Sequence, residues 1–428
     1  MNSPAPDAGM QPFVLRNGVL HAEGVSLQTI AEAVGTPVYV YSRAHFENRY
    51  EALQNAMAPL DVVICYAVKA NSNLSVLRCF AELGAGFDIV SGGELQRLIS
   101  IGVEPAHLVF SGVGKSVAEI DLALKVGIGC FNVESGAELD RIEARAELLS
   151  KVAPISVRIN PDVDANTHPY ISTGLKENKF GVLKEQAIDL YRRAGASEVL
   201  SVRGIDCHIG SQLNTVAPLV EACTNLIEII DELEGSNIHI EHIDMGGGLG
   251  VTYRDEEEFD LDEYGRQLRM LIGERELKLL LEPGRFMVAN GGLLLTRVEY
   301  LKPATSAGHK SFAVVDAAMN DLLRPALYQA WHDVVAVNTR NDSTTEQCWD
   351  IVGPVCESGD FLAHERHMAL SEGDLLAVLS AGAYGMVQSS NYNTRGRPAE
   401  VLVDGSNFQV VRRRETTMDQ LRLELNEG

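Results

Sequence analysis

The stretch "VVICYAVKANSN" (Val62–Asn73) is an apolar run that ends in a lysine. Val62 to Val68 are all apolar or aromatic, which is typical of a strand buried on both faces of a parallel sheet. Lys69 follows directly. An amine at the end of such a strand loses hydration, which favours the neutral form that attacks an aldehyde to give a Schiff base. The strand alone leaves a second interpretation open, a lysine that only reaches solvent.

Runs of this kind, each followed by a helix-like stretch, recur between residues 40 and 290. The eight runs are "DVVICYAVKAN", "GFDIVSGG", "LVFSGVGKS", "IGCFNVES", "ISVRINP", "VRGIDCHIGS", "IEHIDMGGG" and "LLLEPGR". In the stretch after the first run, Leu74, Leu77, Phe80 and Leu83 recur at helical spacing. Strands that alternate with helices predict an α/β fold, and eight units favour a (β/α)₈ TIM-type barrel over an open doubly wound sheet.

Outside the predicted barrel, the sequence no longer alternates between strand-like and helix-like stretches. Beyond residue 295, short strand-like runs such as "SFAVVD" and "AEVLVDG" are separated by Gly and Pro, which predicts a mainly-β C-terminal domain. At the start of the chain, "FVLRNGVLHAEG" has two apolar runs around an Asn-Gly pair, a β-hairpin signal. We therefore predict N-terminal strands over 1–38 that join the β-domain, a cofactor-binding barrel over 39–293 and the β-domain over 294–428.

Composition narrows the class of protein. The chain has 428 residues, 46% of them hydrophobic, and a formal net charge of −23, which opposes binding to nucleic acid and to anionic membranes. Its seven cysteines are scattered without a CxxC pair, which fits a reducing compartment. The polar start "MNSPAPDAGM" gives no signal-peptide pattern, and no apolar run is long enough for a transmembrane helix. A cytoplasmic enzyme with a small-molecule substrate is the expectation.

Polar residues gather where the predicted strands end, at the face where barrels carry their active sites. They are Lys69, Asp88, Ser111, Glu134, Arg158, His208, Gly246–Gly248, Glu282 and Arg285. The glycines of "MGGGLG" let backbone N–H groups converge on a phosphate, and "LEPGR" adds a second turn on the next strand. Glu282 can keep a pyridine nitrogen protonated, and His208 can stack on the ring unless it is structural. A lysine, a phosphate site and a carboxylate together indicate pyridoxal 5′-phosphate (PLP).

Two other motifs do not carry a site. "GVGKS" (Gly112–Ser116) resembles the end of a P-loop, but Val109 stands where that motif needs its first glycine. "HERH" (His364–His367) lacks the HExxH spacing that places two imidazoles on one helix face. We expect no metal.

The order of "YAVKAN", "HIGS", "GGG", "EPGR", "CES" and "AGAYG" resembles the diaminopimelate decarboxylase family of the alanine-racemase-like PLP enzymes. The resemblance runs from about residue 12 to 415 and implies a carboxy-lyase that forms a homodimer with active sites at the subunit interface. It implies Lys69 and Cys356 as catalytic residues. The cofactor-binding residues that it implies are Lys69, Asp88, His208, Ser211, Gly246, Gly247, Gly248, Glu282, Pro283, Gly284, Arg285 and Tyr384.

The implied substrate is meso-2,6-diaminopimelate, which would lose CO₂ at its D-centre to give L-lysine in the last step of lysine biosynthesis. The substrate-binding residues would be Arg285, Arg324, Tyr328, Glu357 and Tyr384. Two guanidinium groups suit a distal carboxylate, and Glu357 suits a distal ammonium. The alternative for Arg324 is an ordinary surface charge. Cys356 is the candidate proton donor to Cα, because a thiol is a competent acid.

Three rival functions remain at this point. A related decarboxylase could act on ornithine, arginine, D-amino acids or carboxynorspermidine, although an arginine that awaits a distal carboxylate would then lack its partner. A racemase would offer a catalytic tyrosine where this chain has "CES". A non-catalytic relative would be expected to lack Lys69 or Cys356. Residues 161–180, rich in Gly, Pro and Asn, are predicted to form a mobile active-site loop.

Overall fold

The computed structural model describes residues 11–163, 179–306, 308–339 and 345–425. Residues 164–178 of the predicted mobile loop lie outside these ranges. Contacts divide the chain into two compact units. The barrel unit comprises 49–251 and 257–287, and the β unit comprises the remaining described residues. The domain boundaries predicted from the sequence, at 38/39 and 293/294, are retained as a proposal.

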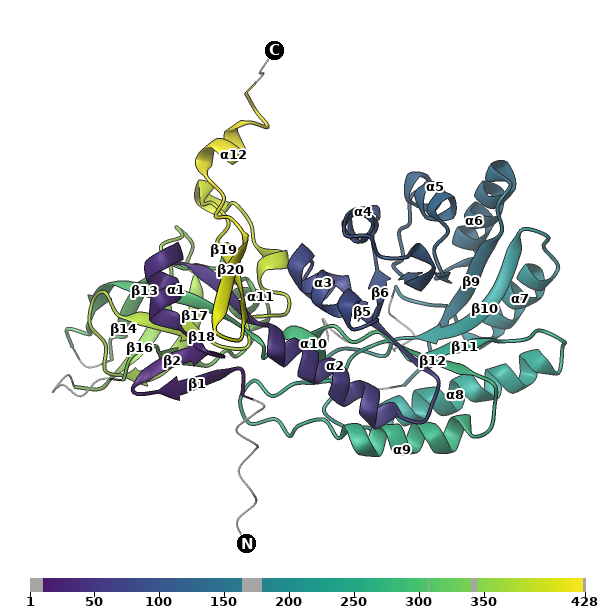
Figure 1. Cartoon of the computed structure of the whole chain (residues 1–428), viewed down its shortest axis with the longest axis horizontal. Coiled ribbons are helices and arrows are strands. Elements are labelled where there is room, and N and C mark those ends of the chain that lie inside the picture. The colour runs from purple at the N-terminus through teal and green to yellow at the C-terminus, as the bar shows by residue number, and fades with distance from the viewer. Residues whose placement is uncertain (1–10, 164–178, 307, 340–344, 426–428) are drawn as a thin grey trace, which may run out of the picture. The chain divides into compact units, whose positions relative to one another are not determined.

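Eight parallel strands close into a barrel, as the sequence predicts (Figure 1). Around the barrel the order is β10-β11-β12-β5-β6-β7-β8-β9. The strands are β5 (Val62–Ala67), β6 (Gly86–Ile89), β7 (Leu108–Phe110), β8 (Cys130–Val133), β9 (Ala153–Ile159), β10 (Leu200–Cys207), β11 (His242–Asp244) and β12 (Lys278–Leu281). Strands β6, β7, β8 and β11 are buried at every residue, which explains why the strands read as continuous apolar runs.

A helix follows each barrel strand, and Figure 1 shows α4 to α9 around the strands. The helices are α3 (Leu74–Glu82), α4 (Gly92–Ser100), α5 (Val117–Val126), α6 (Gly136–Leu149), α7 (Lys184–Gly195), α8 (Ala217–Glu234), α9 (Leu261–Ile272) and the short α10 (Arg285–Val288). Helix α2 (Arg43–Met57) precedes the barrel, and one 3₁₀ turn, η2 (Pro105–His107), precedes β7. In α3 the predicted apolar spacing holds, since Leu77 and Phe80 are fully buried.

Lys69 marks a difference from the sequence prediction. It lies not on β5 but in η1 (Val68–Ala70), a single 3₁₀ turn after the strand. The strand ends at Ala67, whose N–H donates to the carbonyl of Pro283 in the turn after β12. The lysine therefore stands on the barrel rim rather than inside the sheet.

The "GVGKS" stretch has a structural role in the loop between β7 and α5. Ser116 is the N-cap of α5 and forms a reciprocal capping box with Glu119. Lys115 is buried and pairs with Glu138 at 2.7 Å, and it also donates to the carbonyls of Gly112 and Asn132. This lysine joins the β7 loop to β8.

The β unit is built on a nine-stranded mixed sheet. Its main path runs β17-β16-β14-β13-β4-β19-β20, while β18 pairs with β13 and with β15. The strands are β4 (Val38–Ser42), β13 (Gly292–Lys302), β14 (Ser311–Val315), β15 (Val334–Ala336), β16 (Gln347–Val352), β17 (Phe361–Met368), β18 (Leu375–Val378), β19 (Ala399–Asp404) and β20 (Asn407–Arg412). The helical segments are α1 (Leu27–Val34), α11 (Arg324–Tyr328), α12 (Thr417–Leu421) and the 3₁₀ turns η3 (Met386–Gln388) and η4 (Tyr392–Thr394). The mainly-β C-terminal domain is thus confirmed.

The N-terminal segment joins this unit, as predicted. Strands β1 (Phe13–Arg16), β2 (Val19–Ala22) and β3 (Val25–Ser26) form a small antiparallel sheet of their own. The predicted hairpin turn is present, because Asn17 and Gly18 both have positive φ and Arg16 pairs with Val19. Side chains of β2, α1 and β4 share one apolar core with β13 and β19.

Candidate active site

The amine of Lys69 lies 2.6 Å from a carboxylate oxygen of Asp88 on the neighbouring strand β6. Asp88 is fully buried, while the lysine side chain is 36% exposed. The other oxygen of Asp88, Oδ1, is buried and makes no hydrogen bond. The sequence predicts an amine that has lost hydration at a strand end, whereas the structure gives this amine a carboxylate partner. The rim thus holds a partly accessible amine next to a buried acid.

Glu282 follows β12 and is buried. Its Oε1 is 3.4 Å from Ser111 Oγ and 3.5 Å from Asn132 Nδ2, and these two side chains are 3.2 Å apart. Burial, reinforced by the charges of Asp244 and Asp88, raises the pKa of Glu282 well above its ordinary value. A cation or a hydrogen-bond donor placed beside this carboxyl would oppose that shift.

Two more acids lie beside Glu282. Asp206, Asp244 and Glu282 each bring one carboxyl oxygen into a group that spans no more than 4.8 Å. Burial is the main cause of the raised pKa of both aspartates, and mutual repulsion adds to it for Asp206. Protonation can therefore neutralise this group, and an acidic cluster by itself does not indicate a metal. Arg158 supplies positive charge nearby, 2.9 Å from Glu134 and 3.9 Å from Asp206.

The glycine turn after β11 runs very close to other backbone. A Cβ on Gly247 would lie 2.2 Å from the carbonyl oxygen of Glu282. A Cβ on Gly248, where φ is +95°, would lie 2.4 Å from the carbonyl of Gly210. Gly246 also has positive φ, and its N–H donates to Asp244. Only glycine permits this path, so the turn presents backbone instead of side chains.

His208 lies directly after β10 and contacts the glycine turn. Its Nδ1 accepts a hydrogen bond from the N–H of Gly247 at 3.1 Å, which requires a ring without a proton on that atom. Burial lowers the pKa of His208 well below its ordinary value, and the charges of Arg158 and Lys69 lower it further. The ring is therefore held neutral and fixed against the turn.

The turn after β12 holds the remaining barrel residues of the prediction. Pro283 and Gly284 follow Glu282, and buried Arg285 begins α10. Arg285 donates to the hydroxyl of Ser211 from Nη2 at 3.0 Å. The predicted barrel residues therefore collect on one rim, as the strand-end positions indicate.

The other predicted residues belong to the β unit. Arg324, at the start of α11, is buried rather than a surface charge. Its Nη1 lies 3.0 Å from Nε2 of His332, and its guanidinium stacks 4.8 Å from the ring centre of Tyr253. Nδ1 of His332 faces the carbonyl of Leu379 at 2.9 Å, so Nδ1 carries the proton and Nε2 accepts from the arginine. A neutral histidine thus orients this cation.

The last four predicted residues differ in exposure. Tyr328 and Tyr384 are half-buried, and Tyr384 has φ of 55°, a strained conformation for a residue with a Cβ. Cys356 and Glu357 are exposed in the turn between β16 and β17. These four residues belong to the β unit, whereas the rim residues described above belong to the barrel unit.

The sequence does not identify the side chains that contact the predicted site residues Glu282 and Arg324. The sequence marks Ser111 only as a strand end, and it assigns no role to Asn132 and His332. Asn132 had a usable signal, since it is the polar residue inside the apolar run "GCFNV" of β8. His332 had none, because its contact with Arg324 depends on how the segment after α11 folds back.

Comparison with known proteins gives the family. Residues 43–289 match the family model described as "Pyridoxal-dependent decarboxylase, pyridoxal binding domain". The chain is 58% identical to diaminopimelate decarboxylase of Pseudomonas aeruginosa, over 96% of this chain and 98% of the relative. The protein belongs to the diaminopimelate decarboxylase family. The family prediction made from the motifs is confirmed.

Two further relatives agree with this assignment. Diaminopimelate decarboxylase of Pseudomonas fluorescens is 57% identical over 96% of this chain and 98% of its own. The crystal structure of diaminopimelate decarboxylase from Helicobacter pylori complexed with L-lysine superposes with a TM-score of 0.89 at 41% identity, covering 93% of this chain and 98% of the other. In the part of the chain that the structure describes, no helix has the length and apolarity needed to cross a membrane.

The rim residues fit the cofactor of this family. The turn at Gly246–Gly248 packs tightly on other backbone and presents main chain rather than side chains, and turns of this kind suit an anionic group. Glu282 is a buried carboxyl that a protonated ring nitrogen would complement. The buried Oδ1 of Asp88 is a hydrogen-bond acceptor without a partner, next to the only amine of the set. Each of the three groups would suit a different part of pyridoxal phosphate.

Proposed function

We propose that this protein is a PLP-dependent carboxy-lyase that converts meso-2,6-diaminopimelate into L-lysine and CO₂ by decarboxylation at the D-centre, the last step of lysine biosynthesis. One observation carries the proposal: a rim amine paired with Asp88 shares its barrel face with a buried carboxyl and a glycine turn. Known relatives of this chain carry the same activity in their names.

The barrel rim binds and orients the cofactor. Lys69 would hold its aldehyde carbon, and the turn at Gly246–Gly248, with Gly284, Arg285 and Ser211, would hold its phosphate. His208 would cover one face of the ring with a neutral imidazole, and Glu282 would keep the ring nitrogen protonated. Pro283 shapes the turn, and Asp88 lies beside the amine. When bound, pyridoxal phosphate withdraws the electron pair that is released as the carboxylate leaves.

Residues of the β unit and Arg285 of the barrel unit select the substrate, and a β-unit thiol returns a proton. Arg324 and Arg285 receive the distal carboxylate, and Glu357 receives the distal ammonium. Tyr328 and Tyr384 would complete the pocket, and Tyr384 would contact both cofactor and substrate. The thiol of Cys356 donates the proton to Cα after CO₂ has left. The exposure of Cys356 and Glu357 makes both available to a reacting group.

Assay of CO₂ release from the purified holoenzyme tests the proposal. We expect meso-diaminopimelate to react and L-lysine to be the product. Ornithine and lysine lack the distal carboxylate, so they leave the buried Arg324 unpaired and should react at least about 100-fold more slowly in kcat/KM. Release of CO₂ from ornithine with no release from meso-diaminopimelate would overturn the proposal.

We further propose a homodimer in which Cys356 and Glu357 serve the site of the other subunit. Two inactive variants, Lys69→Ala and Cys356→Ala, test this by mixing and reassociation. The mixture should recover up to about a quarter of wild-type activity, because about half of the dimers are heterodimers and one of the two sites in each is intact. Recovery of no activity from a mixture that does form heterodimers contradicts the shared site. We also propose a cytoplasmic location, because the seven cysteines are scattered without a CxxC pair, which fits a reducing compartment.

A further inference from the structure

The turn that carries Cys356 and Glu357 has a rigid base and an exposed tip. At the base, buried Asp360 accepts hydrogen bonds from the N–H of Val355 at 2.8 Å and of Met319 at 2.6 Å. At the tip, the side chains of Cys356 and Glu357 are both exposed. The base fixes where the turn starts, but not how the two tip residues are directed.

A second loop contacts both tip residues, through neighbouring positions in the sequence. Asn393 Oδ1 accepts a hydrogen bond from the backbone N–H of Cys356 at 2.8 Å. The hydroxyl of Tyr392 donates to Oε2 of Glu357 at 3.3 Å. Glu357 raises the pKa of Tyr392, so the phenol stays protonated and keeps its role as donor. Asn393 therefore holds the main chain of Cys356, and Tyr392 holds the carboxylate of Glu357.

The backbone of this loop is set for the contact with Cys356. Asn393 has φ of 55° and Thr394 has φ of 59°, so both lie in the left-handed region. Asparagine tolerates this region better than most residues with a Cβ, and glycine adopts it freely. This conformation is unfavourable for a residue with a Cβ. The backbone strain therefore lies at Asn393, whose side-chain amide contacts Cys356.

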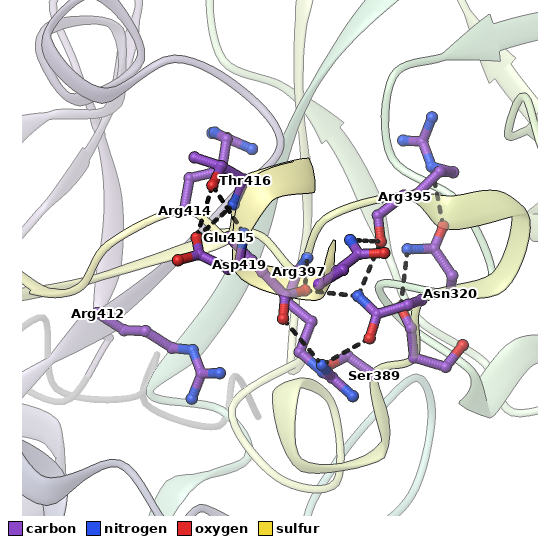
Figure 2. A network of polar contacts seen from close by, with 12 residues as sticks. Asn320, Ser389, Arg395, Arg397, Arg412, Arg414, Glu415, Thr416 and Asp419 are labelled. Atoms are coloured by element: carbon purple, nitrogen blue, oxygen red, sulfur yellow. Dashed lines mark hydrogen bonds and ion pairs between the residues drawn. The ribbon is translucent and has the colours of Figure 1, made fainter. Parts of the chain in front are cut away.

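The segment around the loop is anchored by a polar network, shown in Figure 2. Arg397 donates from Nη1 to Asn391 Oδ1 at 2.9 Å and from its N–H to Glu415 at 3.0 Å. Arg395 donates to buried Asn320 at 3.0 Å, and the N–H of Ser390 donates to the carbonyl of Asn320 at 2.9 Å. The loop is therefore fixed on both sides of Tyr392 and Asn393.

We infer that Tyr392 and Asn393 are positioning residues for this reaction, Tyr392 for the carboxylate that receives the distal ammonium and Asn393 for the thiol. The inference rests on the proposed function, which gives Glu357 and Cys356 their roles. The two contacts act on different steps. Tyr392 acts on substrate recognition and determines specificity, whereas Asn393 acts on the return of the proton to Cα.

Steady-state kinetics of the holoenzyme with meso-diaminopimelate separate the two contacts. Tyr392→Phe removes only the hydroxyl, and we expect KM to rise about 3- to 10-fold with kcat within about 2-fold of wild type. Asn393→Gly keeps the left-handed backbone and removes only the acceptor. We expect kcat to fall about 10-fold with KM nearly unchanged.

Two matched variants exclude a merely structural effect. Thr394→Gly introduces the same backbone freedom at the next left-handed position, and we expect both constants to stay within about 2-fold of wild type. Asn393→Asp restores an oxygen acceptor at the same atom position and should recover most of kcat. If Tyr392→Phe and Asn393→Gly change kcat and KM in the same ratio, or if Thr394→Gly matches Asn393→Gly, the inference is wrong.

The outcome also separates this inference from the proposed function. Wild-type enzyme that releases no CO₂ from meso-diaminopimelate contradicts the proposed function itself. Wild-type enzyme that is active, with Tyr392→Phe and Asn393→Gly both indistinguishable from it, contradicts only the roles of Tyr392 and Asn393.

Discussion

The barrel rim and the Cys356–Glu357 turn position reactive groups in opposite ways. At the rim, Asp88 and Glu282 are buried and influence each other through charge. At the turn, Cys356 and Glu357 are exposed, and single hydrogen bonds from another loop direct them. Burial makes the rim an electrostatic unit in which any one change affects every member. The turn instead allows its two residues to be adjusted one at a time.

The largest effect that we predict belongs to the rim. Lys69→Arg keeps a cation that can pair with Asp88, but a guanidinium does not form the covalent bond to an aldehyde. We expect kcat to fall at least about 10³-fold, with loss of the visible absorbance that the wild-type holoenzyme shows. Absorbance spectra and single-turnover assays measure both. Because the ion pair is kept, the midpoint of thermal unfolding of the apoenzyme should change little.

Lys69→Ala is the matched control for this variant. It removes both the covalent bond and the ion pair, which leaves Asp88 buried without a cation. We expect the same loss of turnover and, in addition, a less stable apoenzyme. Turnover that persists in Lys69→Arg would mean that the rim uses the charge of Lys69 rather than its nucleophilicity.

An intermediate effect is predicted for the β unit. Arg324→Lys keeps the charge but removes the planar fork that binds a carboxylate bidentately and stacks on Tyr253. We expect kcat/KM for meso-diaminopimelate to fall about 10- to 100-fold, mainly through KM. His332→Gln is a useful companion, because its amide oxygen can still accept from Arg324 and should preserve most of the activity. Equal losses in the two variants would show that the histidine does more than orient the arginine.

The sequence predicted the fold and the rim far better than the contacts behind them. Barrel strands are short and buried, so Lys69, His208 and Glu282 could be located from where apolar runs end. Asn393 could not be linked to Cys356 in this way, because the two lie 37 positions apart in irregular loops. His332 could not be linked to Arg324 either, because their contact forms where the segment after α11 folds back. Strand periodicity constrains what stands on a strand end, whereas a contact between loops depends on the packing of the whole unit.

The smallest predicted effect concerns pH, and it tests whether the rim is an electrostatic unit. Burial raises the pKa of Asp244 to about 6, and the pKa values of Asp206 and Glu282 are raised as well. The folded apoenzyme therefore binds more protons than the unfolded chain above pH 4, so these acids lower its stability as the pH rises. For Asp244 the loss develops between the unfolded pKa near 4 and the folded pKa near 6, and it is complete above that range.

Asp244→Asn isolates this contribution from the repulsion of an acidic surface, which also grows with pH. The asparagine can keep the acceptor that Gly246 N–H uses, but it cannot ionise. In urea unfolding of the apoenzymes, the variant should gain on the order of 1–3 kcal/mol relative to wild type between pH 5 and pH 8. Because the three acids are close together, removing one charge should also ease ionisation of Glu282. Parallel curves for the two proteins would mean that the pKa of Asp244 does not change on folding, and the description of the rim as an electrostatic unit would then fail.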